Sequence, residues 1–143
     1  MKNFKRPKNP KKSKEKNLMN DSSKYGSLAL AYLGDAVLET LIREQLVLSG
    51  VTDTGKLTEK ARGYVRAGAQ SDRVEKMLGF LDEEEEAVYK RARNAKNESH
   101  PKSSTAQEYH RATGFEAVFG WLYLAKKMDR LHELFNLCYP DID

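Results

Sequence analysis

The sequence has very little cysteine: Cys138 is the only one among 143 residues. A single thiol excludes an internal disulfide framework, and the absence of C-x-x-C and H-x-x-x-H spacings argues against a structural zinc site. Apolar runs are also short, because none approaches the roughly 18 to 20 residues that cross a bilayer, and no apolar segment follows the basic N-terminus as in a signal peptide. We therefore expect a soluble, cytoplasmic protein that is neither secreted nor bound to a membrane.

Excess positive charge is missing from most of the chain and is concentrated at its start. The formal net charge is +4, yet residues 1–17 hold eight Lys and Arg side chains and only one acidic residue, Glu15. Residues 1–20 also have almost no apolar side chains to bury, which predicts a disordered basic N-terminal arm followed by one folded domain over residues 21–143. Such an arm either binds nucleic acid through phosphate contacts or serves only as solubilising disorder.

Helical spacing of apolar residues recurs along the whole folded part, and no stretch alternates with the period of a strand. Asp82 and Glu85 match a capping box, and Ser104 with Gln107 matches another helix start. The expected fold class is therefore all-α. The expected helices cover residues 22–50, residues 57–78 with a bend around 63–68, a stretch from Asp82 through Ala95, residues 104–124 and residues 130–137, with a loop at 97–103.

Two carboxylates stand in the most apolar segments of the chain. Asp35 lies in LALAYLGDAVLETLI and Glu116 lies in ATGFEAVFGWLYL, where small residues surround it at helical spacing. A buried carboxylate is very unfavourable unless it is paired, hydrogen-bonded or bound to a cation, so the two helices could meet and hold one hard divalent cation. The alternative is that each carboxylate faces solvent, or pairs with a basic residue such as Arg43 or Arg111. The spacing alone leaves both interpretations open.

Two motifs carry a resemblance to a known family. AYLGDAVLE resembles the signature segment of ribonuclease III domains, and GFEAVFGWLYL, about 80 residues later, resembles their second catalytic segment. Between them, RARNAK, the PK pair at 101–102 and Tyr109 are similar to the Mini-III branch, which lacks a separate domain for binding double-stranded RNA. The resemblance spans roughly residues 28–124. It implies a ribonuclease III-like endonuclease domain, built as a helical bundle, over residues 21–143.

The resemblance implies that Asp35 and Glu116 are the catalytic pair and bind Mg²⁺. The larger relatives have two further acidic positions, which are Leu28 and Thr113 here, so the number of metal ions per site stays open. Glu39 is expected to form an ion pair with Arg43 rather than a further metal contact. Magnesium held by carboxylates activates water and stabilises phosphoryl charge, so no general-base histidine is needed. We interpret the three histidines, His100, His110 and His132, as loop or surface residues.

The resemblance also implies the partners of the protein. A basic stretch at a helix end and the following loop is expected to contact the backbone of A-form RNA; its residues are Arg91, Arg93, Asn94, Lys96 and Lys102. The implied enzyme is a homodimer with the signature helix at its interface, cutting both strands of double-stranded RNA and leaving 3′ overhangs with 5′-phosphates. The implied substrate is the precursor of bacterial 23S ribosomal RNA.

Two other functions are compatible with parts of this pattern. A catalytically silent ribonuclease III-like protein that binds RNA during ribosome assembly would explain the loss of two acidic positions. A helical protein-interaction module with a basic arm would explain the composition but would leave Asp35 and Glu116 without a role. The endoribonuclease is the favoured hypothesis because both carboxylates are retained in apolar helices.

Overall fold

The described part of the chain is built from helices alone. A computed structural model describes residues 21–96 and 105–142, without the side chains of residues 67, 68 and 71, and these ranges contain no strand. The predicted N-terminal arm, residues 1–20, and Lys102 lie outside the described residues. The elements are η1 (Ser22–Lys24), α2 (Ser27–Leu48), α3 (Thr54–Val65), α4 (Ala67–Leu78), α5 (Glu83–Arg93), α6 (Ala106–Leu124) and α7 (Met128–Cys138). The prediction of an all-α bundle is confirmed.

Side chains at the helix starts fix most of the boundaries. Asp53 accepts a hydrogen bond from the backbone of Lys56, so α3 begins three residues before the expected position. The capping box of Asp82 and Glu85 is present as predicted, whereas α6 is capped by Thr105, one residue after the expected Ser104. Helix α5 ends at Arg93 instead of continuing through Ala95. These shifts move boundaries by a few residues and leave every expected helix in place.

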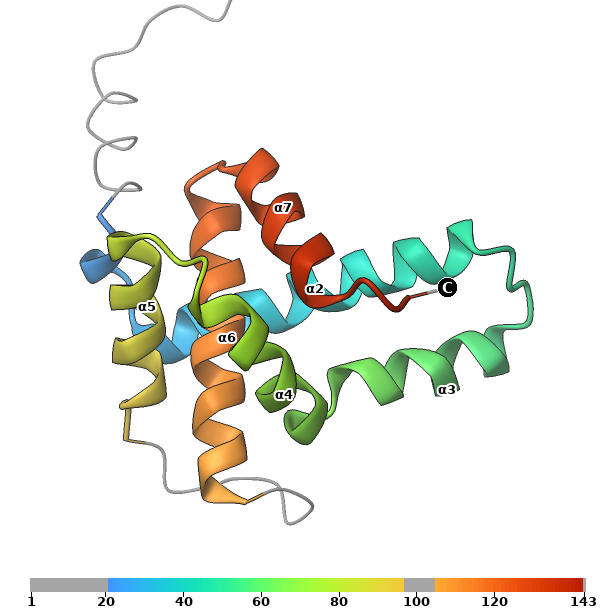
Figure 1. The fold of residues 1–143 in the computed structure, drawn as a ribbon, viewed down its shortest axis with the longest axis horizontal. Coiled ribbons are helices and arrows are strands. Elements are labelled where there is room, and N and C mark those ends of the chain that lie inside the picture. The colour runs from blue at the N-terminus through green and yellow to red at the C-terminus, as the bar shows by residue number, and fades with distance from the viewer. Residues whose placement is uncertain (1–20, 97–104, 143) are drawn as a thin grey trace, which may run out of the picture.

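The break between α3 and α4 lies at Arg66 and not at either neighbouring glycine. Arg66 has extended backbone angles, φ −61° and ψ 141°, which end one helix and begin the next. The predicted bend in this region is therefore confirmed, and its physical form is a single extended residue. In Figure 1, α3 runs beside the C-terminal half of α2 and away from the rest of the bundle.

Helix α6 is the centre of the core. Its side chains from Ala112 to Leu122 are buried except that of Glu116, which is half-buried. Helices α2, α4, α5 and α7 all pack on α6, as Figure 1 shows. A helix that is apolar around its whole circumference must be enclosed in this way. None of the helices in the described ranges is long and apolar enough to span a bilayer.

Two glycines allow α2 and α6 to touch through their backbones. A Cβ atom on Gly34 would lie 1.7 Å from the carbonyl oxygen of Glu116, and one on Gly120 would lie 2.0 Å from the carbonyl oxygen of Leu30. Real Cβ atoms do not approach other atoms this closely, so only glycine fits at either position. The crossing therefore sets the distance between the two helices that carry Asp35 and Glu116.

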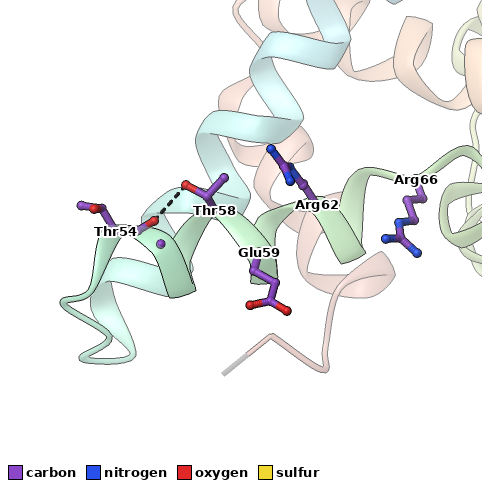
Figure 2. A pocket seen from close by; sticks show the side chains of 6 residues that line it. Thr54, Thr58, Glu59, Arg62 and Arg66 are labelled. Atoms are coloured by element: carbon purple, nitrogen blue, oxygen red, sulfur yellow. Dashed lines mark hydrogen bonds between the residues drawn. The ribbon is translucent and has the colours of Figure 1, made fainter.

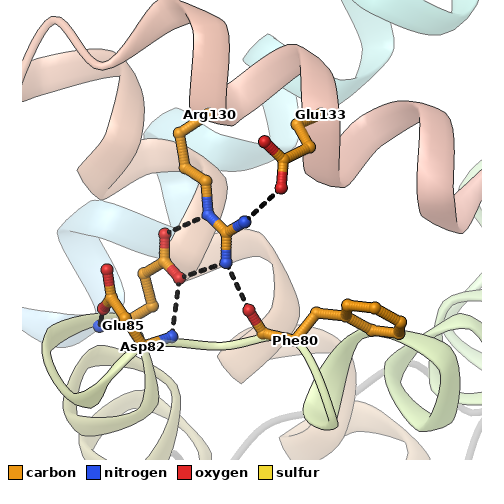
Figure 3. A network of polar contacts seen from close by, with 5 residues as sticks. All are labelled: Phe80, Asp82, Glu85, Arg130 and Glu133. Atoms are coloured by element: carbon orange, nitrogen blue, oxygen red, sulfur yellow. Dashed lines mark hydrogen bonds and ion pairs between the residues drawn. The ribbon is translucent and has the colours of Figure 1, made fainter.

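A buried ion pair fastens the start of α5 to α7 (Figure 3). The Glu85 side chain is only 1% exposed, and its two carboxylate oxygens accept hydrogen bonds of 2.9 Å from Arg130. Arg130 also donates to the Phe80 carbonyl oxygen and to Glu133, while the Asp82 backbone N–H donates to Glu85. Removing one partner of such a fully bonded pair typically costs about 3–5 kcal/mol. The acidic run at residues 83–86 is thus structural, as its capping position suggested.

Candidate active site

The crossing of α2 and α6 brings Asp35 and Glu116 close to each other. Asp35 directly follows Gly34, whose Cα lies against the Glu116 backbone. Burial, together with the smaller effect of the negative charge of Asp35, raises the pKa of Glu116 to about 8. The pKa of Asp35 is also raised, first by burial of its carboxyl group and then by the charge of Glu39. The structure therefore brings the two predicted site residues together.

Asp35 is more accessible than its apolar sequence context predicted. The face of α2 that packs into the core includes Leu30, Ala31, Gly34, Val37 and Leu38, and Asp35 lies at the edge of this face as an exposed residue. Of the two interpretations that the spacing left open, exposure to solvent holds for Asp35, and burial holds for the larger part of Glu116. One carboxylate opens to solvent while the other lies deeper in the protein, so a ligand can reach the pair from outside.

The pair has no cationic partner within the part of the chain that the structure describes. Arg43 forms an ion pair with Glu39 at 2.6 Å, as expected, and Arg111 pairs with Glu75. No hydrogen bond or ion pair engages the carboxylate of Asp35 or of Glu116 in residues 21–96 and 105–142. The alternative that Arg43 or Arg111 neutralises one of them is therefore wrong. Two neighbouring carboxylates without a counter-charge suit a hard divalent cation.

Among the described residues, Asp35 and Glu116 are the two carboxylates available to such a cation. Within the described ranges, no group of three or more His, Cys, Asp or Glu side chains is placed to hold a metal ion. At the two positions that are acidic in the larger relatives, Leu28 is partly exposed and Thr113 is buried, with its hydroxyl donating to the Tyr109 carbonyl oxygen at 2.8 Å. Neither supplies a third charged ligand. The donor set fits Mg²⁺, which binds through one or two carboxylates and keeps several water molecules.

The predicted RNA-binding residues divide into two groups. Arg91 donates to the Ser22 hydroxyl at 2.5 Å, and Ser22 donates to Glu84 at 2.5 Å, so Arg91 also holds η1 against α5. Arg93 and Asn94 lie together at the end of α5, where the Arg93 Nε donates to the Asn94 Oδ1 at 3.1 Å. Lys96 is exposed just beyond them. Lys102 lies outside the residues described, so the structure places four of the five predicted side chains.

The sequence did not single out the residues on the first turns of α6. Gln107, His110 and Arg111 line a hollow together with Arg93 and Asn94. His110 was interpreted as an ordinary loop or surface residue, whereas its side chain is half-buried in this hollow. The spacing i, i+3 and i+4 places these three polar residues on one helix face, and this was the available signal.

A second hollow lies along α3, away from the carboxylate pair. Its lining residues all come from α3 and the residue that ends it (Figure 2). They are Thr54, Gly55, Thr58, Glu59, Arg62 and Arg66. Neither Asp35 nor Glu116 lines it. The Thr58 hydroxyl donates to the Thr54 carbonyl oxygen at 2.8 Å, so it is used within the helix. We assign no function to this surface.

Comparison with known proteins agrees with this geometry. The family profile for the Ribonuclease III domain matches residues 28–127, which include both carboxylates and both motifs. The chain belongs to the ribonuclease III family. The fold and the endoribonuclease class that the resemblance implied are therefore confirmed.

Similarity to individual ribonuclease III proteins extends over most of the chain. It is 44% identical to the Mini-ribonuclease 3 of Enterococcus faecalis, over 87% of this chain and 96% of that protein. It is 38% identical to the Mini-ribonuclease 3 of Streptococcus pneumoniae, over 87% of this chain and 99% of that protein. A crystal structure of a Fusobacterium nucleatum protein superposes with a TM-score of 0.74 at 36% identity, covering 81% of this chain and 94% of that one. The resemblance to the Mini-III branch is thus confirmed.

Proposed function

We propose that this member of the ribonuclease III family is a Mg²⁺-dependent endoribonuclease that cuts double-stranded RNA through Asp35 and Glu116. One observation carries the proposal: two acidic side chains are held together at a backbone crossing, and no described basic side chain pairs with either of them. Keeping such a pair costs stability, so a ligand that removes the cost is expected. A divalent cation held by Asp35 and Glu116 would be that ligand.

The two residues have different tasks in this site. Glu116, whose pKa burial raises to about 8, would hold the cation in its charged form, and the rigid crossing fixes its position. Asp35, on the exposed edge of α2, is the member of the pair that is open to solvent. When bound, Mg²⁺ supplies positive charge for the phosphoryl oxygens and lowers the pKa of a bound water molecule. Asp35 and Glu116 thus orient the cation, and no histidine is required.

The exposed face of α2 next to Asp35 is the proposed dimer interface. Tyr32 is 84% exposed and Leu28 is 38% exposed, and with Asp35 they lie at positions i, i+4 and i+7 of one helix face. Large exposed apolar side chains of this kind mark association surfaces. A two-fold dimer about this face would place two sites beside each other, so each subunit would cut one strand of a duplex. As the resemblance implies, the products would carry 3′ overhangs and 5′-phosphates.

The proposed biological substrate is the 23S ribosomal RNA precursor, and the proposed location is the cytoplasm. The relatives that carry the name Mini-ribonuclease 3 support a ribonuclease of this branch. A second candidate, a catalytically silent RNA-binding protein of ribosome assembly, is favoured only by the lack of a third acidic ligand in the described ranges. The close approach of Asp35 and Glu116 favours the enzyme.

The first prediction separates these two candidates. The protein is incubated with end-labelled duplex RNA in Mg²⁺, and a parallel reaction contains EDTA. We expect cleavage of both strands in Mg²⁺ and none in EDTA, with 5′-phosphates on the products. Single-stranded RNA of the same sequence serves as the control and should remain intact. Tight binding of the duplex without cleavage in Mg²⁺ would favour the silent protein, and neither binding nor cleavage would contradict both candidates.

A further inference from the structure

The hollow on the first turns of α6 lies where three helices meet, and we call it the arginine hollow. It is lined from α4 by Glu75 and Leu78, from α5 and its end by Tyr89, Arg93 and Asn94, and from α6 by Gln107, His110 and Arg111. Except for Leu78, every lining side chain is polar or charged. Glu116 lies on the same helix but on another face: Arg111 precedes it by five residues, which is a rise of about 7.5 Å and a turn of about 140° around the axis of α6.

A buried tyrosine forms the floor of the arginine hollow. Tyr89 is only 3% exposed and its ring lies flat against α6 at Gly114. A Cβ atom on Gly114 would lie 2.6 Å from the Tyr89 Cδ2 atom and 2.9 Å from its carbonyl oxygen. Because glycine leaves room for the ring, Tyr89 is fixed between the two helices. The floor is therefore part of the rigid core.

Tyr89 in turn holds two arginines from different helices. The guanidinium carbon of Arg93 lies 5.5 Å from the centre of the Tyr89 ring, and its Nε donates to the Asn94 side chain. Arg111 forms a hydrogen bond with the Tyr89 hydroxyl group and an ion pair with Glu75. Two guanidinium groups are thus oriented before any ligand binds. Pre-orientation of this kind lowers the entropy cost of binding.

The chemistry of the lining side chains fits the backbone of RNA. Guanidinium groups donate paired hydrogen bonds to phosphate oxygens, and the amides of Asn94 and Gln107 can donate to a phosphate or accept from a ribose hydroxyl. Glu75 can only accept hydrogen bonds, and it could accept one from a ribose 2′-hydroxyl group. Of the two rings that line the hollow, Tyr89 is buried and His110 is half-buried, so the side chains that reach its surface are mainly hydrogen-bonding and charged groups.

We propose that the arginine hollow binds a ribose–phosphate segment of the RNA strand, with Gln107, His110 and Arg111 as contact residues in addition to Arg93 and Asn94. This inference rests on the proposed function, because it assigns a part of the RNA substrate outside the cleavage site. It extends the predicted RNA contacts from the end of α5 to the first turns of α6. Arg111 would exchange part of its ion pair with Glu75 for the phosphate.

The variant Arg111→Gln tests the phosphate contact. Glutamine can keep a hydrogen bond to the Tyr89 hydroxyl but has no charge. Affinity for a short RNA duplex is measured in EDTA at several salt concentrations, so that no cleavage occurs. We expect affinity to fall by about ten-fold and the slope of log affinity against log salt to fall by about 1, since one fewer counterion is released. In Mg²⁺, KM should rise while kcat changes by less than about two-fold.

A second variant and a control accompany this measurement. Gln107→Leu changes an exposed side chain, so it tests the hollow even if Arg111→Gln does not fold; its affinity should fall without a change in salt slope. Lys127→Gln removes the same charge at the opposite end of α6 and should bind as wild type. The proposal is contradicted if the wild-type protein cuts duplex RNA but both hollow variants bind it normally. It is also contradicted if Lys127→Gln lowers the slope of log affinity against log salt as much as Arg111→Gln does. If the wild-type protein neither binds nor cuts duplex RNA, the proposed function fails and this inference fails with it.

Discussion

Replacing Asp35 with Asn is expected to lower kcat for double-stranded RNA by at least about 10³-fold in Mg²⁺, which corresponds to roughly 4 kcal/mol of activation free energy. The substitution keeps the size of the side chain and removes the charge that, with Glu116, would hold the cation. Glu116→Gln should have a similar effect because the site offers no third carboxylate within the described ranges. Single-turnover cleavage of a labelled duplex measures both losses.

The controls for this prediction separate lost chemistry from lost folding. Metal-free Asp35→Asn and Glu116→Gln proteins should be at least as resistant to thermal unfolding as the wild type, because each removes an ionisable group whose charged form burial disfavours. Glu44→Gln removes an exposed carboxylate from the same helix, α2, and should retain wild-type activity. Cleavage by Asp35→Asn at a rate within ten-fold of wild type would contradict the role assigned to Asp35.

A methyl group on Gly34 is expected to destabilise the protein strongly and to abolish cleavage. In Gly34→Ala the new Cβ would lie 1.7 Å from the Glu116 carbonyl oxygen and 2.9 Å from the Gly120 backbone nitrogen. These are backbone atoms of a buried helix, so the two helices must separate. We expect a loss of about 3 kcal/mol or more, which lowers Tm by about 10 °C or more. Circular dichroism during heating measures this change.

A glycine elsewhere provides the matched control. Gly63 is in the interior of α3, and a Cβ atom there would meet nothing within 4 Å. Gly63→Ala should therefore raise stability by up to about 1 kcal/mol, because alanine favours the helix. If Gly34→Ala unfolds at the wild-type temperature, the close backbone crossing does not exist as described. If it is folded but inactive, the crossing is needed mainly to position Asp35 and Glu116.

Most of the fold could be predicted from the sequence because its local signals agree with its packing. The apolar stripe before residue 50 and the capping box at Asp82 both correspond to observed helices. The errors in the helix boundaries arise where the local sequence signal for a cap or a bend is weak. Asp53 was overlooked as a cap, and the bend was predicted only as a region, residues 63–68, without Arg66 as the extended residue. Pairings over long distances, such as Glu85 with Arg130, left no trace in the local pattern.

The candidate site was only partly predictable for a related reason. Apolar context and family resemblance singled out Asp35 and Glu116, but periodicity alone could not show that two helices touch through Gly34 and Gly120. The exposure of Asp35 depends on which edge of α2 faces α6, and a shift of one residue would change it. The arginine hollow depends on the packing of α4, α5 and α6 around Tyr89. Its parts are 36 positions apart in sequence at the widest, from Glu75 to Arg111.

The most direct test of the central claim is the pKa of Glu116, measured by ¹³C NMR of its side-chain carboxyl group with and without Mg²⁺. In metal-free protein, burial and the charge of Asp35 should hold this pKa at about 8, so the group is protonated at neutral pH. A cation held between Asp35 and Glu116 favours the charged form and should lower the pKa by several units, with release of a proton on binding. A pKa near 4.5 without metal, or one that Mg²⁺ leaves unchanged, would contradict a shared cation site.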